Sequence, residues 1–369
     1  MKALVTGHKG FIGKNLMLKL AEQEIEAVTF GREDDTSSLK SLVKDIDIIF
    51  HLAGVNRPLD NEEFYQGNTQ LTEELCKALK ETSSRATVVF TSSIQAELDN
   101  DYGKSKAAAE ALLEELSESN LNPILNYRLP NIFGKWCQPN YNSFVATFCN
   151  NIANNIDITI HDSDAKVNLT YIDDLLDDFS QNMSSLEKLQ GYKSLSPSIV
   201  YSSTVGEVAD AIRKFKDSRK TLVTESVGNG FNRALYATFL SYYPTHDFSY
   251  GVPLYGDERG MFAELVKTKD SGQFSFFTAG PGVTRGGHYH HTKNEKFIVV
   301  SGQARFGFRH MVTGEKYYLE VSSEKPQVVE TIPGWSHDIT NIGSDDMIVL
   351  LWANEIFDRN KPDTVASKV

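Results

Sequence analysis

Hydrophobic positions in the first half of the chain follow two alternating spacings. Short β-branched or aliphatic runs, which predict strands, are separated by longer stretches with helical spacing, such as residues 14–23 and 70–81. The expected strands cover residues 3–5, 26–30, 46–52, 87–91 and 123–128. Because strands that alternate with helices form βαβ units, this half predicts an α/β fold with a doubly wound parallel sheet of the Rossmann type.

The pattern changes near residue 244. Residues 244–256 are rich in Pro, Gly and Tyr and lack a regular spacing, so we expect a linker there, between domains of residues 1–243 and 257–369. The second domain contains short strand-like runs at residues 262–267, 273–278, 296–300, 304–310, 316–321, 327–332 and 347–353. Many short strands at near-regular spacing predict an all-β sandwich or barrel.

Composition narrows the class of protein. A length of 369 residues favours two domains over one. The net charge of −12 argues against nucleic acid or an anionic membrane as a partner. The three cysteines show no CxxC spacing, which favours a reducing cytoplasm over a disulfide framework. No apolar run is long enough to span a bilayer, and we expect no signal peptide because the first strand begins at residue 3.

A glycine-rich turn follows the first expected strand and leads into a helix. Gly7 permits the tight turn, Gly10 lets a pyrophosphate approach the backbone, and Gly13 allows close helix–sheet packing. This context predicts a dinucleotide site. The residues expected to contact the cofactor are Gly7, His8, Gly10, Phe11, Ile12 and Gly13, with Leu52 and Ala53 at the end of the third strand.

The end of the second expected strand bears on the choice of cofactor. An acidic residue there would accept hydrogen bonds from the ribose 2′-hydroxyl of NAD, whereas an arginine can pair with the 2′-phosphate of NADP. Arg32 follows this strand, so we expect Arg32 to bind NADPH. Glu33 beside it leaves open the alternative that Arg32 is an ordinary surface residue.

A second group of polar residues follows the strand at 87–91. Ser92 and Ser93 end the buried run. Tyr102 and Lys106 lie four residues apart, on one face of the helix that follows. A phenol titrates near about 10, and an adjacent ammonium favours its anion. We therefore expect Tyr102 to be the general acid for a carbonyl that is being reduced, with Ser93, or alternatively Ser92, bound to the same oxygen.

With these residues the chain resembles the extended short-chain dehydrogenase/reductases over residues 1–243. The shared motifs are the glycine turn, residues 51–54, Asn68, the serine, and Tyr102 with Lys106. The resemblance implies that Tyr102 and Lys106 also touch the cofactor and that Arg128 and Asn131 meet the sugar nucleotide. Only eight residues separate Ser93 from Tyr102, fewer than is usual in the family, so the alignment of the serine stays open.

Two departures narrow the reaction that this resemblance implies. Dehydratases of the family carry an Asp-Glu pair beside the catalytic serine or threonine, but Ile94 and Gln95 follow Ser93 here. The 4-epimerases hold NAD permanently, whereas Arg32 indicates NADP. Both departures favour a plain carbonyl reductase.

Residues 282–302 match the cupin motif G-x5-H-x-H-x4-E-x6-G at each spacing. His288 and His290 are expected on one face of a strand, with Glu295 on the next strand. His337, in a second motif, is the fourth expected metal ligand. Three imidazoles and one carboxylate suit Zn²⁺, Mn²⁺, Fe²⁺ or Ni²⁺, and ligand types alone do not choose among them; we expect Zn²⁺.

Two alternatives stay open for this motif. A β-bulge would exchange His288 for His291 as a ligand. Alternatively, the barrel binds no metal, and its histidines act as bases or the barrel only dimerises.

The join of a short-chain reductase to a cupin resembles the CapF family of bacterial capsular polysaccharide enzymes, over nearly the whole chain. The resemblance implies C3 epimerisation of a UDP-linked 2-acetamido-2,6-dideoxy-4-keto-hexose at the cupin. It also implies NADPH reduction of the C4 ketone at the reductase, on the route to UDP-N-acetyl-L-fucosamine, and we expect a homodimer. Two alternatives are a single-reaction keto-sugar reductase with a structural cupin and a non-catalytic NADP-sensing protein. Ser93, Tyr102 and Lys106 argue against the sensor, which needs no proton donor.

Overall fold

The structure of the chain is a computed structural model that describes residues 1–58, 60, 62–253, 255–257, 260–262, 266–268, 272–355 and 360–369. Its contacts divide it into two compact units. The first contains residues 1–133, 141–143 and 167–202, and the second contains residues 134–140, 144–166 and 203–369. Residues 203–243 therefore fall in the same compact unit as the C-terminal strands, whereas the sequence pattern places them in the first domain. The linker at 244–256, whose residue 254 lies outside the described residues, stays a prediction.

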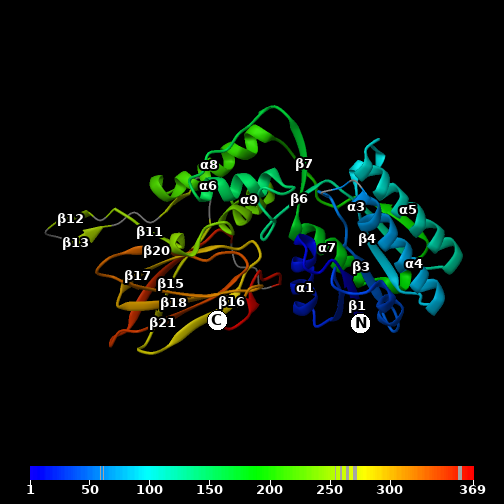
Figure 1. Cartoon of the computed structure of the whole chain (residues 1–369). Helices are drawn as coiled ribbons and strands as arrows, with labels where there is room; N and C mark the ends of the chain where they lie inside the picture. Colours follow the sequence, from blue (N-terminus) through cyan, green and yellow to red (C-terminus); the bar gives the residue numbers. More distant parts are fainter. Residues whose placement is uncertain are drawn as a thin grey trace. The chain divides into compact units, whose positions relative to one another are not determined.

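The first unit is built on a six-stranded sheet, shown with its helices in Figure 1. The strands are β1 (Lys2–Thr6), β2 (Glu26–Phe30), β3 (Ile48–His51), β4 (Thr87–Ser93), β5 (Ile124–Leu129) and β8 (Tyr192–Leu195). Their order is β2-β1-β3-β4-β5-β8, and every neighbouring pair is parallel, which confirms the predicted Rossmann-type sheet. The order reverses at β1 and β3, and ligands of such sheets bind at the carboxyl ends of the strands beside this point.

Helices cover both faces of this sheet. They are α1 (Phe11–Glu22), α2 (Leu39–Leu42), α3 (Glu62–Phe64), α4 (Leu71–Thr82), α5 (Asp101–Asn120) and α7 (Ile172–Met183). Ile49 of β3 packs in one cluster with Leu79 of α4 and Leu113 of α5. The next residue, Phe50, instead meets Phe179 of α7, with ring centres 5.5 Å apart. Successive strand residues point to opposite faces, so this alternation shows that the sheet is covered on both sides.

Shorter elements complete the first unit. A π-helix (Tyr65–Gln70) leads into α4, and 3₁₀ turns cover Thr36–Ser38, Ile94–Glu97 and Leu186–Lys188. A separate three-stranded sheet has the order β6-β7-β9, formed by β6 (Asn131–Phe133), β7 (Lys166–Tyr171) and β9 (Tyr201–Thr204). Residues of β7 and β9 fall on both sides of the division between the units.

The helices of the second unit form one packed group. They are α6 (Phe144–Ala153), α8 (Val205–Thr221) and α9 (Gly230–Leu240), followed by a 3₁₀ turn at Thr245–Asp247. A capping box starts α8, because Thr204 and Glu207 each bond the other's backbone nitrogen. Phe215 of α8 lies with its ring centre 5.0 Å from that of Tyr236 on α9, which joins the two helices through a buried aromatic contact.

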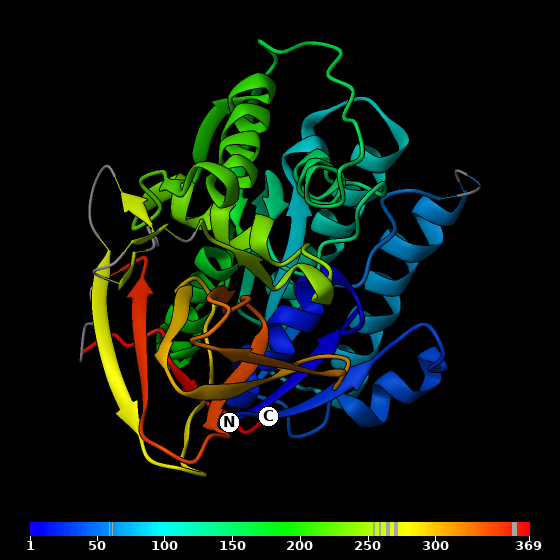
Figure 2. The same cartoon turned by 90° about the vertical axis from the view of Figure 1, so that its left-hand side faces the viewer.

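Most of the remaining second unit is antiparallel β-structure in two five-stranded sheets, drawn mainly in yellow to red in Figure 2. One sheet has the order β11 (Ser249–Gly251), β20 (Gln327–Glu330), β17 (Glu295–Ser301), β22 (Met347–Ala353) and β15 (Gln273–Ala279). The other has the order β19 (Lys316–Ser322), β18 (Gln303–His310), β21 (Trp335–Asn341), β16 (Thr284–Tyr289) and β23 (Val365–Ala366). Phe297 of the first sheet meets Phe306 of the second, with ring centres 5.6 Å apart, inside this β-domain. The predicted all-β C-terminal region is confirmed.

Four short strands stand outside these two sheets. They are β10 (Val223–Thr224) with β14 (Lys267–Thr268), and β12 (Tyr255–Asp257) with β13 (Gly260–Phe262). Of the strand predicted at 262–267, residues 263–265 lie outside the described residues.

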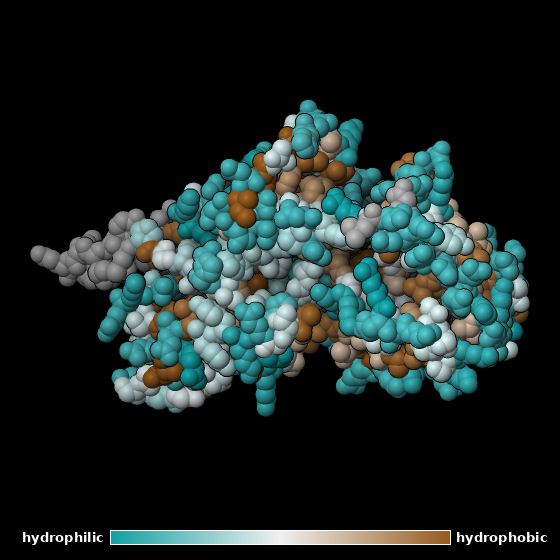
Figure 3. Space-filling view, in the orientation of Figure 1, coloured by the Kyte–Doolittle hydropathy of each residue, from teal (hydrophilic) through white to brown (hydrophobic). Residues whose placement is uncertain are grey.

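The visible surface is mostly hydrophilic, with separate apolar patches, as Figure 3 shows. Some large apolar side chains are well exposed, among them Phe274 at 53% and Phe276 at 70%, both on β15 at the edge of its sheet. None of the helices in the described part of the chain is both long enough and apolar enough to cross a membrane.

Candidate functional site

The glycine turn after β1 has the shape that a dinucleotide site needs. Gly7 has a φ of +71°, and a Cβ atom there would lie 2.7 Å from the Ala53 nitrogen. A Cβ atom on Gly13 would lie 2.3 Å from the Gly7 oxygen. The turn ends at Gly10, the N-cap of α1, which has no side-chain cap for the first helical N–H groups. Such free N–H groups at a helix N-terminus bind phosphate. The turn and the start of α1 can therefore accommodate the pyrophosphate of a dinucleotide.

The expected cofactor residues outside this turn lie next to it. Ala53 donates a backbone hydrogen bond of 3.1 Å to Thr6 Oγ1, which brings the end of β3 against the end of β1. His8, Phe11 and Ile12 lie in the turn and the first helical turn, and Leu52 precedes Ala53. Their contacts with a cofactor stay predictions.

Arg32 is exposed two residues after the end of β2. Its neighbour Glu33 forms an ion pair with Lys9. The carboxylate of Glu33 is thus paired with another residue than Arg32. No ion pair ties Arg32 itself to the described residues. The guanidinium is therefore available to an anionic group beside the glycine turn.

The predicted catalytic residues come together at the end of β4 and the start of α5. Asn100 caps α5 by accepting a 2.8 Å hydrogen bond from Gly103 N, which places Tyr102 in the first turn. A Cβ atom on Gly103 would lie 2.3 Å from the Gln95 oxygen, so glycine allows the helix to start close to the strand end. Tyr102 lies beside Ser93 at the end of β4, where Gln95 N donates a 3.1 Å hydrogen bond to Ser93 Oγ.

Burial sets the ionisation of these groups. It raises the pKa of Tyr102, against the opposing effect of the neighbouring Ser93 hydroxyl. It lowers the pKa of Lys106 to about 8, although Glu110 acts in the other direction. Lys106 Nζ donates a 2.9 Å hydrogen bond to the Thr91 oxygen. Burial therefore has a larger effect on the pKa of Tyr102 than any neighbouring charge, and a raised pKa favours the protonated form that a proton donor requires.

Glu110 is a residue of this site that the motif did not reveal. It accepts a 2.5 Å hydrogen bond from Ser92 Oγ and bonds of 3.1 Å and 2.7 Å from the Arg128 guanidinium. The alternative of Ser92 as the partner of the substrate therefore loses support, since its hydroxyl is bound to a buried carboxylate. The only sequence signal for Glu110 is its position, one helical turn after Lys106.

The two predicted sugar-nucleotide residues have different surroundings. Arg128 is held by Glu110 and, at 2.8 Å, by Glu97. Asn131 is exposed on β6. Neither placement tests contact with a substrate, so both assignments stay predictions.

Four residues of the β-domain form a cluster that can hold a metal ion. His288 lies next to the last residue of β16, His290 directly follows that strand, Glu295 begins β17, and His337 lies on β21. One ligand atom from each lies within 4.8 Å of all the others. The cluster combines residues of both five-stranded sheets, because β17 belongs to one and β16 and β21 belong to the other.

The chemistry of this donor set fits a divalent transition metal. Burial, reinforced by His337 and His290, lowers the pKa of His288 to about 3. Burial acts to raise the pKa of Glu295, but the neighbouring imidazoles of His290 and His337 hold it well below its usual range. Neither ring nitrogen of the buried His337 has a hydrogen-bond partner within the described part of the chain. Imidazole nitrogens together with a carboxylate oxygen are ligands that Zn²⁺ takes.

His291 does not belong to this cluster. Its Nδ1 lies 3.2 Å from Lys135 Nζ, and its ring packs against Tyr289. A β-bulge does occur, but it lies between Gly286 and His288, and it leaves His288 paired with His337. The geometry favours His288 over His291 as the ligand.

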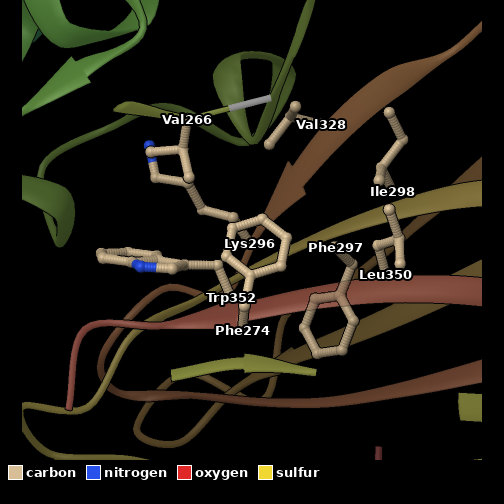
Figure 4. A pocket seen from close by; sticks show the side chains of 8 residues that line it. All are labelled: Val266, Phe274, Lys296, Phe297, Ile298, Val328, Leu350 and Trp352. Carbon is tan, nitrogen blue, oxygen red and sulfur yellow. The ribbon is translucent and has the colours of Figure 1, made fainter. Parts of the chain in front are cut away.

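An apolar pocket on the β-domain offers no comparable chemistry (Figure 4). It is lined by Val266, Phe274, Lys296, Phe297, Ile298, Val328, Leu350 and Trp352. Lys296 Nζ is bound to Glu330 and Tyr250, both at 2.9 Å. The one charged side chain among the described lining residues is therefore already paired, and the other lining side chains are aliphatic or aromatic.

Comparison with known proteins agrees with both halves of the chain. The NAD dependent epimerase/dehydratase family matches residues 3–191, and the polysaccharide biosynthesis C-terminal domain matches residues 255–365. UDP-2-acetamido-2,6-beta-L-arabino-hexul-4-ose reductase of Pseudomonas aeruginosa is 54% identical over 370 residues, with 100% of this chain and 99% of that protein covered.

Solved structures give the same relationship. The capsular polysaccharide assembling protein CapF from Staphylococcus aureus is 40% identical, with 100% of both chains covered and a TM-score of 0.67. The UDP-glucose 4-epimerase of Thermus thermophilus shares the fold over 58% of this chain and 83% of its own, at 18% identity and a TM-score of 0.52. The chain therefore belongs to the NAD-dependent epimerase/dehydratase family of oxidoreductases, which use a nicotinamide dinucleotide, and within it to the CapF enzymes with a polysaccharide biosynthesis C-terminal domain.

Proposed function

We propose that this chain makes a precursor of capsular polysaccharide in two steps. The C-terminal region, a cupin, inverts C3 of a UDP-linked 2-acetamido-2,6-dideoxy-4-keto-hexose, and the N-terminal region then reduces the C4 ketone with NADPH, on the route to UDP-N-acetyl-L-fucosamine. The Pseudomonas relative, whose name describes a reductase of a UDP-linked hexul-4-ose, supports this class of substrate. The observation that carries the reduction is the placement of Tyr102 in the first turn of α5, beside Ser93 at the end of β4 and one helical turn before the buried Lys106.

The reductase step follows from the positions of these side chains. NADPH, bound over the glycine turn, supplies the hydride. Tyr102 gives its proton to the C4 oxygen, so the ketone becomes an alcohol, and Tyr102 recovers a proton from solvent. Ser93 holds the same oxygen by a hydrogen bond. Lys106 keeps a positive charge beside the site below about pH 8, where it can bind the cofactor ribose.

Arg32 supports NADPH over NADH in this proposal. It is exposed, its neighbour Glu33 is paired with Lys9, and it follows the strand beside the glycine turn. A guanidinium at this point binds a 2′-phosphate through charge-assisted hydrogen bonds.

The epimerase step uses the β-domain cluster. His288, His290, Glu295 and His337 would hold the ion, for which we propose Zn²⁺. A divalent metal supplies Lewis acidity to the keto oxygen and so acidifies the neighbouring C3–H bond. The chain's own contribution is a buried setting, since His290, Glu295 and His337 are each at most 5% exposed, and electrostatic effects are larger where water is excluded.

Two other functions make different predictions. If the chain is a single-reaction reductase with a structural, dimerising cupin, His290→Ala should give a product with the same C3 configuration as the wild-type product. An NADP-sensing protein would bind the cofactor without turnover, but Tyr102 beside Ser93 provides a proton donor that sensing does not need. The expected homodimer is compatible with all three functions.

One incubation separates the three functions. The full-length protein is given NADPH and a UDP-linked 2-acetamido-2,6-dideoxy-4-keto-hexose, and the product is assigned by NMR. The proposal predicts NADPH oxidation and a C4 alcohol with inverted C3. A C4 alcohol with retained C3 indicates the single-reaction reductase, and no NADPH oxidation indicates the sensor.

A further inference from the structure

The C-terminal tail, residues 360–369, contacts the turn at residues 290–294 that joins the proposed metal ligands. Asp363 Oδ1 accepts a 2.8 Å hydrogen bond from His291 N. Its Oδ2 accepts bonds of 2.6 Å from the backbone nitrogens of both Thr292 and Lys293, and one of 3.0 Å from Thr292 Oγ1. One carboxylate thus satisfies three successive backbone donors in the turn between His290 and Glu295.

The same tail contacts two of the ligands directly. The backbone oxygen of Asp363 accepts a hydrogen bond from Nδ1 of His290. Because a carbonyl only accepts, Nδ1 carries the proton, and Nε2 is the atom that lies 3.3 Å from Glu295 Oε2. Two residues later, β23 pairs with β16, with Ala366 opposite His288. The tail therefore sets the ring orientation of His290 and covers the edge of the strand that carries His288.

Further bonds fix the end of the tail on the β-domain. Arg309 donates bonds of 2.9 Å and 2.8 Å to the Lys368 oxygen, and Ser336 Oγ donates to the Ser367 oxygen. Ser367 N donates a 2.8 Å bond to the Gly287 oxygen. These contacts fix the chain on the far side of Asp363. The bonds of the Asp363 carboxylate go to His291 N, Thr292 and Lys293 N, and not to the side chain of a proposed ligand.

The turn needs an external partner because of its place in the fold. It crosses from β16 in one sheet to β17 in the other, so its shape sets the spacing of His288 and His290 from Glu295. Residues 290–294 contain no glycine or proline that would impose a turn. Buried backbone N–H groups without partners cost free energy, and here one distant carboxylate supplies the partners.

We infer that Asp363 is a positioning residue of the proposed metal centre, through which the C-terminal tail holds the 290–294 turn in the metal-binding conformation. This inference rests on the proposed function, since it assumes that the four-residue cluster binds a metal. Residues that orient metal ligands without touching the metal change affinity by about 10- to 100-fold when they are replaced. We expect a loss of that size in Asp363→Ala.

The test measures metal affinity in the full-length protein. Each variant is stripped of metal and titrated with Zn²⁺ against a competing chromophoric chelator. Asp363→Ala should bind Zn²⁺ about 10- to 100-fold more weakly than the wild type, and Asp363→Asn, which keeps one acceptor oxygen, should lie between them. Glu320→Ala is the matched control, because it removes an exposed carboxylate from β19 of the same domain and should leave the affinity unchanged.

Two further readings separate the possible failures. Denaturant unfolding of each metal-free variant reports whether the β-domain is folded, and NADPH binding reports the same for the first unit. Asp363→Asn serves if Asp363→Ala does not fold. Equal Zn²⁺ affinities in the folded Asp363 variants and the wild type overturn the inference and leave the proposed metal centre intact. A wild type that takes up no Zn²⁺ overturns the proposed metal centre, and the role of Asp363 with it.

Discussion

The candidate active site of the first unit is local in sequence, whereas the candidate metal centre of the second unit is not. Ser93, Tyr102 and Lys106 lie between residues 93 and 106, on one strand end and one helix. The metal cluster uses residues from His288 to His337 and is held by Asp363 of the tail. Each site also contains a carboxylate whose hydrogen bonds go to neighbouring protein groups. This carboxylate is Glu110 in the first unit and Asp363 in the second.

This difference shows what each site depends on. A helix fixes the spacing of Tyr102 and Lys106 by its own geometry, so the first site needs only the packing of α5 against β4. The second site depends on the strand registers of both β-sheets. It also depends on the conformation of the 290–294 turn and on the tail that holds this turn. We therefore expect side-chain changes to silence the first site without disturbing its shape, and changes outside the ligands to weaken the second.

Replacing the proton donor should have the largest effect. Tyr102→Phe should lower the rate of NADPH oxidation with a keto-sugar by about 10²- to 10⁴-fold, while NADPH affinity stays nearly unchanged, because only the proton is lost. Tyr318→Phe, at a tyrosine 53% exposed in the β-domain, is the control. Wild-type turnover in Tyr102→Phe would contradict the assignment.

The buried Lys106 should give the first unit a characteristic pH dependence. Its pKa falls from 10.5 to about 8 in the folded protein, so between these values the unfolded chain binds more protons and stability rises with pH. The rise amounts to about 3 kcal/mol at most, from 1.36 kcal/mol for each pKa unit. Lys106→Met should remove it, as measured by urea unfolding of the metal-free protein at about pH 8 and about pH 10. Parallel profiles of the two proteins would show that Lys106 is not desolvated.

Changing Arg32 should alter the choice of cofactor. Arg32→Asp should weaken NADPH binding by about 10- to 100-fold, the size of one or two hydrogen bonds to a charged group, and relatively favour NADH. Dissociation constants for both cofactors, measured by fluorescence titration, provide the check. Arg85→Asp makes the same charge change at an exposed site of the same unit and should leave the preference as it is. An unchanged preference in Arg32→Asp would exclude contact with the 2′-phosphate.

Glu110 should have the smallest effect of these changes. Glu110→Gln keeps an acceptor for Ser92 but loses the charge that holds Arg128, which should cost about 1 kcal/mol of unfolding free energy. Glu114→Gln, at an exposed site on the same helix, should change little. Equal stabilities of the two variants would mean that the Glu110 pair contributes nothing net.

The sequence predicted the fold better in the first unit than in the second. Buried parallel strands such as β3 and β4 are continuous apolar runs, and each predicted run is found. In the β-domain, apolar runs did not predict β16 and β21. Glycine, histidine and polar residues occupy much of Thr284–Tyr289 and Trp335–Asn341. These two strands carry ligands, and the polar residues of the cluster replace the apolar pattern that marks a strand.

The candidate sites show the same limit. The motif spacings predicted the four residues that the structure brings within 4.8 Å. They did not predict Asp363, whose partners lie 70 to 72 residues away, nor the grouping of residues 203–243 with the β-domain. Such contacts follow from tertiary packing, and no local spacing records them.

The two-site account is tested most directly by hydrogen exchange at C3 of the keto-sugar in D₂O. Tyr102→Phe should still exchange this hydrogen while it oxidises no NADPH, because exchange needs no hydride. Glu295→Ala should lose the exchange yet bind NADPH normally, since the two sites lie in different compact units. Because the loss of a ligand can loosen the fold, melting of Glu295→Ala is recorded beside its activity. Exchange that persists in a folded, metal-free Glu295→Ala protein would contradict the metal mechanism, and loss of exchange in Tyr102→Phe would contradict the separation of the two sites.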